Sequence, residues 1–232
     1  MDIKIVFENS HIVVVDKAPG VLSTPSRFKD EDGRFCLGTA LQDHLGTQIY
    51  PVHRLDFEVS GLVMYAKNAE AHRIANSWFE KKEVSKTYRA WTTGQDFSHI
   101  PANVTNPRVS TELAPGQSFK WESLLLRGKR RAFESPQGKP SLTLATYLGR
   151  SEAYHSWDLH PVTGRAHQLR FDLSRHGFPI VGDKLYGSLE KWGRGESIAL
   201  RAYLIDLTKS PFVEKLGLPP FFRVSENPIA EL

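Results

Sequence analysis

Short stretches of β-branched and aromatic residues, separated by turn residues, recur along the whole chain. Such side chains pack well on a pleated surface, so these stretches favour strands. We expect strands at residues 3–7, 11–15, 61–66, 87–92, 141–148, 154–160 and 198–207. Helical patterns are few and do not alternate regularly with the strands. The order therefore predicts a mixed α+β domain and not a regular βαβ fold.

Three segments carry a helical pattern. A leucine at every fourth position of residues 37–45 predicts a short helix. Asn68 is a good N-cap residue, and apolar positions recur at helical spacing after it. The third helix is expected over residues 165–175. Residues 95–118 are the least regular part, but no change in composition divides the chain, so we expect one domain over residues 1–232.

Composition limits the class of protein. Hydrophobic residues make up 40% of the chain and charged residues 24%, which is typical of a globular protein and not of a disordered one. No apolar run approaches the roughly 18 residues that a membrane span needs, and the N-terminal apolar stretch is too short for a secretory signal. Cys36 is the only cysteine, which excludes an intramolecular disulfide, an iron–sulfur cluster and a cysteine-based zinc finger. We expect a cytoplasmic protein without contact to a membrane.

Positive charge is concentrated in one segment. The formal net charge of the chain is +4, and residues 119–139 contain six basic and two acidic side chains. Within them, residues 127–131 form a run whose glycine suits the turn of a hairpin-like tip. The basic side chains of this run fit a solvated loop and a phosphate-contacting arm equally well; they are Arg127, Lys129, Arg130 and Arg131.

The common catalytic and cofactor motifs are absent from the sequence. There is no Gly-x-x-x-x-Gly-Lys-Ser/Thr, no Gly-x-Gly-x-x-Gly after a strand and no Gly-x-Ser-x-Gly. The chain has nine histidines but no His-Glu-x-x-His, and a loop is expected between His160 and His167. Histidines with a structural role are the commoner case, so we predict no metal site.

Three polar segments are unusual for a purely structural protein. Residues 52–61 are dense in polar side chains and stand just before a buried strand, whereas residues 85–90 place a tyrosine among basic residues, and residues 160–170 form a loop that opens a helix. Taken one at a time, each has a structural explanation. The key side chains would then be a turn residue, a core ring and a helix-surface cation; they are Asp56, Tyr88 and Arg170.

Taken together and in order, these segments resemble the RluA-type pseudouridine synthases. Members of that family carry His-Arg-Leu-Asp-x-x-Thr-Ser-Gly, then a tyrosine in a strand, then Thr-Gly-Arg-x-His-Gln-Leu/Ile-Arg. Residues 53–61, Tyr88 and residues 163–170 match these motifs. The family's Lys-x-Pro-Gly and Gly-His-Pro-Ile-x-Gly-Asp-x-x-Tyr-Gly are matched by residues 17–20 and 177–187. Two motifs of this length in the correct order are highly specific.

The resemblance covers nearly the whole chain, and its departures leave the chemistry untouched. Val59 replaces a threonine, Phe178 replaces a histidine, and Arg201 stands where many members have a histidine. The resemblance implies a mixed, mainly antiparallel sheet with flanking helices. It also implies a single catalytic domain without the separate N-terminal RNA-binding module of many relatives.

The resemblance assigns the chemistry to three side chains. Asp56 is the essential carboxylate, which either attacks the anomeric carbon or takes a proton from the neighbouring ribose carbon, and both routes need its ionised form. Arg170 is its partner, and a guanidinium fork can hold a carboxylate with two hydrogen bonds. Tyr88 stacks on the target base, which has to be flipped out of the RNA. The isomerisation consumes no water and no electrons, so no cofactor is expected.

Other side chains are implied in substrate binding. Arg54 fills the space that the flipped nucleotide leaves or holds that nucleotide. Three residues are expected to shape the loops around the substrate, namely His53, Arg165 and His167. The resemblance also favours phosphate contacts by the basic tip, at Lys129, Arg130 and Arg131. The expected partner is ribosomal or transfer RNA, and the protein is expected to be a monomer.

The sequence leaves two other classes of protein to consider. A non-catalytic RNA-binding protein on the same fold is disfavoured. A site that had lost its catalytic activity would be expected to lose the ionised pair as well, yet Asp56 and Arg170 are both present. A glycosidase using Asp56 with Glu58 is the other possibility, since residues two apart on a strand face the same way. No separate acid with a raised pKa is evident for it in the sequence.

Overall fold

The computed structural model describes residues 2–26, 32–102, 104, 108–151, 153–193 and 195–228. Within these residues the strands are β1 (Ile5–Glu8), β2 (Ile12–Lys17), β3 (Tyr50–Pro51), β4 (Ser60–Ala66), β5 (Ser85–Thr92), β6 (Ser118–Arg127), β7 (Ala132–Glu134), β8 (Lys139–Arg150), β9 (His155–Pro161), β10 (Leu200–Asp206) and β11 (Phe221–Arg223). The helices are α1 (Leu37–Leu45), α2 (Ala69–Glu80) and α3 (Gln168–Arg175), with short 3₁₀ turns at Lys184–Tyr186 and Glu214–Leu216.

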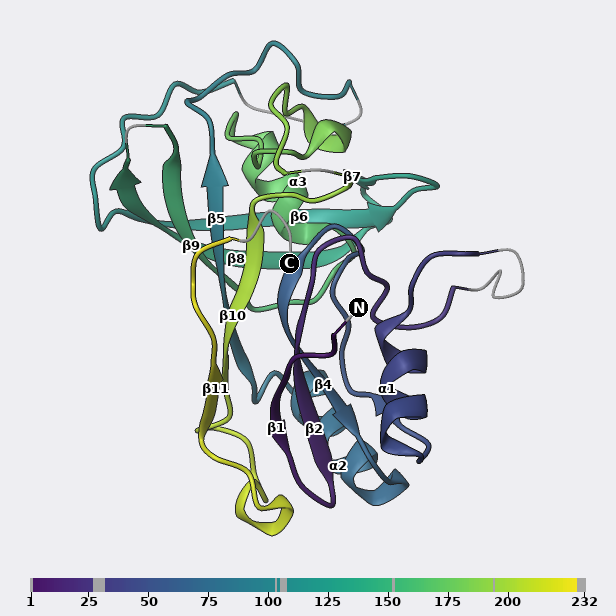
Figure 1. Ribbon diagram of the computed structural model, residues 1–232. Coiled ribbons are helices and arrows are strands. Elements are labelled where there is room, and N and C mark those ends of the chain that lie inside the picture. Colours follow the sequence, from purple (N-terminus) through teal and green to yellow (C-terminus); the bar gives the residue numbers. More distant parts are fainter. Residues whose placement is uncertain are drawn as a thin grey trace.

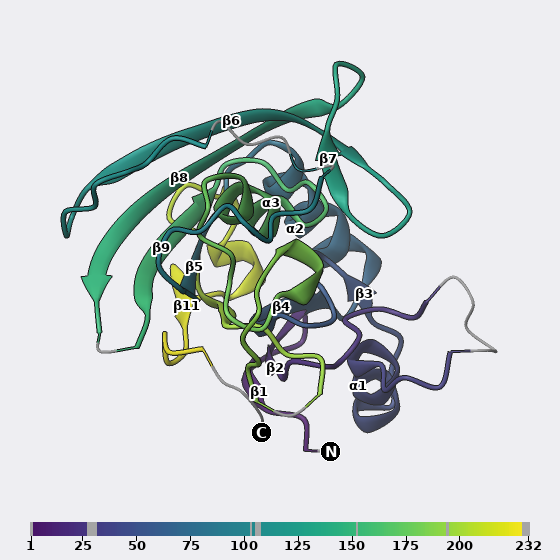
Figure 2. The ribbon, with the colours of Figure 1, turned by 90° about the horizontal axis from the view of Figure 1, so that it is seen from above.

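All these strands belong to one mixed sheet (Figure 1). Its order is β1-β2-β4-β10-β5-β9-β8-β6-β7, with β11 beside β10 and β3 beside β4. Among the strand pairs of the described residues, β4 and β10 run parallel and the others antiparallel. The predicted α+β class with a mainly antiparallel sheet is confirmed. Seen from above, β6 and β8 arch across the molecule, and α3 lies on their concave side (Figure 2).

The helices begin and end close to the predicted residues. Asn68 caps α2, because its side-chain oxygen accepts a hydrogen bond from the backbone N–H of Ala71 at 2.9 Å. The third helix begins at Gln168, three residues later than predicted. The reason is local: the Gln168 side chain turns back and accepts hydrogen bonds from the hydroxyl of Thr163 and the backbone N–H of Arg165. This keeps residues 163–167 in a loop that faces the active-site pocket.

Four strands were not predicted, and β6 is the largest of them. It alternates between buried and exposed positions, but its outward side includes the exposed Leu124 and Leu126, which obscures the pattern. The hairpin predicted around residues 127–131 is present, because β6 pairs with β7 and Arg127 lies opposite Ala132. The short strands β3 and β11 carry too few residues for a recognisable pattern.

The central strands are buried on both faces. Along β2, Val13 and Val15 pack in one apolar cluster with residues of α1, β5 and β9, whereas Ile12 and Val14 pack in a second cluster around Trp78 of α2. Because side chains alternate between the two faces of a strand, both faces must be apolar here. This explains why the sequence of these strands reads as a continuous apolar run.

Gly61 allows β4 and β10 to lie side by side. It pairs with Ala202, has a φ of +116°, and a Cβ at this position would lie 2.1 Å from the backbone oxygen of Ala202. No side chain larger than hydrogen fits there, and the backbone angle is one that other residues rarely adopt. The close approach fixes the start of β4, and therefore the loop of residues 53–59 that precedes it.

Candidate active site

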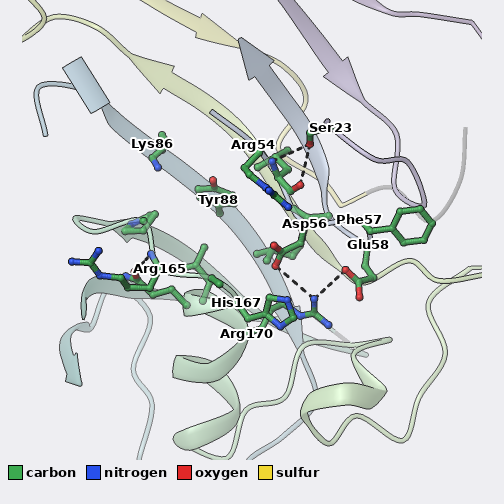
Figure 3. Close-up of a pocket in the computed structure, with 18 of the residues that line it drawn as sticks. Ser23, Arg54, Asp56, Phe57, Glu58, Lys86, Tyr88, Arg165, His167 and Arg170 are labelled. Carbon is green, nitrogen blue, oxygen red and sulfur yellow. Dashed lines mark hydrogen bonds and ion pairs between the residues drawn. The ribbon is translucent and has the colours of Figure 1, made fainter. Parts of the chain in front are cut away.

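The three polar segments of the sequence converge on one pocket (Figure 3). It has a volume of about 490 Å³ and is lined by the loop of residues 54–59, by Tyr88 on β5, and by residues 163–170, which lead into α3. Its wall also includes loop residues 22–24 and Arg127 at the end of β6, together with Arg34, Lys86, Pro161 and Leu200. A pocket of this size suits a ligand as large as a nucleoside.

The loop that carries Asp56 is held from beneath by two polar side chains. The Lys17 ammonium donates hydrogen bonds to the backbone oxygens of Ala18, Val21 and Phe57, at 2.8, 2.8 and 3.2 Å. Burial lowers the pKa of Lys17 to about 7, although the nearby carboxylates oppose this shift.

A second anchor lies one residue before Asp56. The hydroxyl of Ser23 donates to the backbone oxygen of Leu55 at 3.0 Å and accepts from its N–H at 3.1 Å. Together with the Lys17 contacts, these bonds fix the backbone on both sides of the carboxylate. Catalysis requires such fixed geometry, since small displacements of a reacting group are costly.

Asp56 and Arg170 form an ion pair in the pocket. Oδ2 of Asp56 lies 3.6 Å from Nη1 of Arg170, and the same Nη1 donates to Oε2 of Glu58 at 3.0 Å. The prediction that the guanidinium fork would hold Asp56 with two hydrogen bonds is wrong. The fork instead holds Asp183, with Nε to Oδ2 at 2.6 Å and Nη2 to Oδ1 at 2.8 Å.

Burial explains this division of the guanidinium. The side chain of Asp183 is 1% exposed and needs two charge-assisted hydrogen bonds to be stable as an anion, whereas that of Asp56 is 29% exposed and keeps contact with solvent. Burial acts to lower the pKa of Arg170, but the charge of Asp183, its hydrogen bonds and the two other carboxylates outweigh burial and raise it. The guanidinium is therefore a permanent cation in the wall of the pocket.

Tyr88 projects from β5 into the same pocket and is 7% exposed. Burial raises the pKa of its phenol, and the negative charge of Asp56 raises it further. The ring is therefore present as a neutral phenol, with a π-face and a hydroxyl close to the ion pair. Such a ring can stack on a planar base.

The remaining predicted residues lie around the pocket in different ways. Arg54 is exposed and lines the pocket near its opening. Arg165 also lines it, and its Nε donates to the backbone oxygen of Pro140 at 2.9 Å. His167 lines the pocket, adopts a left-handed backbone conformation with φ of 52°, and its Nδ1 lies 3.3 Å from the hydroxyl of Tyr186.

His53 points away from this pocket. Its Nε2 accepts a hydrogen bond from the backbone N–H of Met64 at 3.2 Å, and its ring stacks on Phe79 with 4.8 Å between the centroids. Burial and the charge of Lys86 lower the pKa of His53 to about 3, so the ring is neutral. It lines a second pocket beside the first.

The basic residues at the tip of the β6–β7 hairpin differ in their exposure and in their contacts. Lys129 and Arg130 are exposed, whereas Arg131 is half-buried and its Nη1 donates to the backbone oxygen of Leu185 at 3.3 Å. Arg127, at the base of the tip, reaches the active-site pocket. Of the predicted basic run, Arg127 is therefore the residue closest to the ion pair.

The sequence reasoning missed the contribution of Asp183. Its signal was present, because Asp183 lies in the motif match at residues 177–187, but a family motif does not say which carboxylate a given arginine holds. Glu58 was considered only for a glycosidase, yet it shares Nη1 of Arg170 with Asp56. In the sequence, Lys86 stands out only as a basic neighbour of Tyr88, with no predicted role. In the structure, both side chains line the pocket.

The chain is similar to known RNA pseudouridine synthases. Residues 11–175 match the family model described as RNA pseudouridylate synthase. The dual-specificity RNA pseudouridine synthase RluA of Vibrio parahaemolyticus is 33% identical over 203 residues, which are 85% of this chain and 74% of that protein. The tRNA pseudouridine synthase C of Vibrio vulnificus is 28% identical over 189 residues, or 80% of this chain and 74% of that protein.

Two further relatives complete the comparison. An uncharacterized RNA pseudouridine synthase of Helicobacter pylori is 31% identical over 197 residues, and the match spans 82% of this chain but 61% of that protein. Among solved structures, human RNA pseudouridylate synthase domain containing 1 superposes with a TM-score of 0.66 at 24% identity, covering 97% of this chain and 91% of that chain. That similarity confirms the fold.

The family model and the Vibrio parahaemolyticus relative establish the class: the chain belongs to the RNA pseudouridylate synthase family, whose members are isomerases that act on RNA. Within that family it is an RluA-type enzyme, as the order of its motifs predicts. The two alternative classes, a non-catalytic RNA-binding protein and a glycosidase, are set aside by this membership.

Among the described residues, no helix has both the length and the apolar character needed to cross a bilayer.

Proposed function

We propose that this chain converts specific uridines of structured ribosomal or transfer RNA into pseudouridine, with Asp56 as the essential carboxylate. The observation that carries the proposal is the pocket in which the Asp56 carboxylate, 3.6 Å from Nη1 of Arg170, shares a wall with the Tyr88 ring. An ionised carboxylate, a fixed cation and an aromatic face are what the isomerisation requires of a protein.

The reaction needs a flipped nucleotide, because a base stacked inside RNA cannot reach the carboxylate. With the uracil against Tyr88, Asp56 either attacks the anomeric carbon or removes a proton from the neighbouring ribose carbon, and the glycosidic C–N bond breaks. The freed uracil turns, and one of its ring carbons bonds to the anomeric carbon. This step releases Asp56 from that carbon or returns the proton to the neighbouring one. The uracil carbon then loses its hydrogen as a proton, and the ring nitrogen that left the ribose gains a proton. Every atom of the substrate is kept in the product, so neither water nor electrons enter the balance.

Arg170 supports this chemistry by placing a positive charge beside the Asp56 carboxylate. A single N–H of the guanidinium faces Asp56, so the other lone pairs of that carboxylate stay available to the ribose. Three other N–H groups donate to Asp183 and Glu58, which hold the guanidinium in place. Arg170 is therefore a positive charge that these hydrogen bonds hold in a fixed position beside Asp56.

RNA binding is assigned to two groups of cationic side chains. Arg54 and Arg165 line the active-site pocket, with His53 in the adjoining wall, and the hairpin tip carries Lys129, Arg130 and Arg131. The names of two relatives specify dual-specificity and transfer-RNA enzymes, which supports ribosomal or transfer RNA as substrate. The described strands form one continuous sheet, which supports a single catalytic domain. We propose that it acts as a monomer in the cytoplasm.

The test is a map of pseudouridines in total RNA from cells with and without the gene. We expect one or a few uridines to lose the modification when the gene is deleted. A gene copy encoding the wild-type protein should restore them, whereas one encoding Asp56→Asn should not. Identical maps with and without the gene would overturn the proposed activity, and restoration by Asp56→Asn would overturn the role of Asp56.

A further inference from the structure

A second pocket adjoins the active site. It has a volume of about 420 Å³ and is formed by residues 53–54, by the end of α2 and the turn that leads into β5, and by residues 161–165. Both pockets are lined by Arg54, Lys86, Pro161, Thr163, Gly164 and Arg165. We call it the outer pocket. Because the two pockets share this wall, they are adjacent, and a polymer bound in the first one can extend into the second.

The outer pocket is strongly cationic. Four basic side chains line it, namely Arg54, Lys82, Lys86 and Arg165. Of its lining residues, Glu80 is the one with a carboxylate, and that carboxylate accepts a hydrogen bond from Asn76 at 2.8 Å. A concave surface with such an excess of positive charge attracts anions.

Lys86 is held in this wall without a counterion. Its Nζ lies 5.5 Å from the centroid of the Phe79 ring, and in the described part of the chain no carboxylate lies within ion-pair distance of it. The side chain is half-buried, and burial lowers the pKa of Lys86 to about 8. A cation–π contact positions an ammonium without neutralising it, so the charge stays available to a ligand.

His53 adds an uncharged donor to the same wall. Because its Nε2 accepts the N–H of Met64, the proton of the neutral ring is on Nδ1. The ring is fixed by its stacking on Phe79, the same ring that carries Lys86. His53 and Lys86 are thus both in contact with the Phe79 ring in the wall of the outer pocket, which also contains Arg54 and Lys82.

We propose that the outer pocket binds the backbone phosphate of the RNA next to the uridine inserted beside Tyr88, with Lys86 as its principal contact. This proposal rests on the proposed function and extends it by a substrate subsite. Lys86 and Tyr88 are two residues apart on β5, so both side chains leave the same face of one strand, as Figure 3 shows. One strand would therefore position the base through Tyr88 and the adjacent phosphodiester through Lys86.

The test measures how salt affects RNA binding. All proteins carry Asp56→Asn to prevent turnover, and the probe is fluorescently labelled bulk transfer RNA from cells lacking the gene. In this background Lys86→Met should weaken binding and reduce the slope of log affinity against log salt by about one, which is the loss of one phosphate contact. Lys86→Arg should restore most of the slope, because it keeps the charge. Lys191→Met, an exposed lysine outside both pockets, is the matched control and should leave the slope unchanged.

Lys82→Met provides a second test of the outer pocket in case Lys86→Met does not fold. Lys82 is exposed and lines only the outer pocket, so its loss should also lower the salt slope while leaving the thermal unfolding curve unchanged. A wild-type slope for a correctly folded Lys86→Met, or for Lys82→Met if Lys86→Met does not fold, would overturn the phosphate site. The proposed isomerase activity fails on a different readout, namely unchanged pseudouridine maps, so the two failures are distinguishable.

Discussion

Arg170 and Asp183 are joined by two short hydrogen bonds, and both side chains are almost fully buried. The fork of the guanidinium thus faces the protein interior, and only Nη1 is directed at the pocket carboxylates. Asp183 therefore does not contact the substrate site itself. It determines where the positive charge next to Asp56 stands.

Asp183→Asn should separate positioning from binding. The amide keeps the shape of the carboxylate but turns an N–H group towards the guanidinium, and it removes the buried negative charge. We expect kcat to fall at least tenfold and the free energy of unfolding to fall by about 3 kcal/mol. RNA affinity should stay within a few-fold of wild type. A fall in kcat no larger than the loss of folded protein would show that Asp183 has only a structural role.

Asp56→Asn and Glu58→Gln form a matched pair, because both remove one charge beside Nη1 of Arg170. Asp56→Asn should abolish pseudouridine formation in a purified system and leave RNA affinity within several-fold. Glu58→Gln should lower kcat less than tenfold, since Glu58 only shares the guanidinium. Both rates are measured on a transcript that contains the mapped uridine. Equal losses from the two substitutions would contradict a special role for Asp56.

Gly61→Ala should separate β4 from β10. Its methyl group would meet the backbone oxygen of Ala202, and alanine would also have to adopt the positive φ of this position. We expect the free energy of unfolding to fall by about 3 to 5 kcal/mol. Gly33→Ala is the control, because a Cβ at Gly33 meets no atom of the described residues within 4 Å. Chemical denaturation of the two variants measures the difference, and equal stabilities would argue against the close approach.

The hairpin tip offers a test of RNA contact at a distance from the reacting base. Lys129→Ala combined with Arg130→Ala removes two exposed charges and should weaken RNA binding and lower its salt slope by up to about two. The control is Lys191→Ala combined with Lys209→Ala, which removes two exposed charges elsewhere. Should both double variants have the same slope, the tip is a solvated loop.

Asp172 should make stability depend on pH. It is 2% exposed on α3, it accepts a hydrogen bond from Thr143 at 2.6 Å, and burial raises its pKa to about 7 from a model-peptide value of 3.8. The folded state then binds a proton that the unfolded state has released, so this contribution is complete below pH 4 and is lost as pH rises to about 7.

Asp172→Asn should remove that dependence. Relative to wild type, the variant should gain stability between pH 4 and pH 8, by up to about 4 kcal/mol. Denaturant unfolding of both proteins at several pH values measures this gain. A constant difference between the two across the range would mean that Asp172 has the same pKa in the folded and unfolded states.

Local patterns predicted much of this structure. Alternation or β-branched and aromatic residues located β2, β5, β8 and β9, and a compact apolar run located β4. Asn68 located the start of α2. These signals act over a few residues. The motif order identified the residues that meet in the pocket. What it did not reveal is which partner each charge takes: Arg170 was expected to grip Asp56, yet Asp183 is buried more deeply and holds the guanidinium. Such a choice depends on relative burial, which is a property of the assembled fold.

The position of β10 between β4 and β5 has a consequence for biosynthesis. β4 continues from the loop that bears Asp56, and β5 bears Tyr88, but the strand that joins them is formed by residues 200–206. A nascent chain on the ribosome therefore carries both halves of its catalytic centre long before it can bring them together. Truncated translation products that stop ahead of Leu200 would lack this joining strand, so we expect RNA-modifying activity only from molecules that extend beyond it.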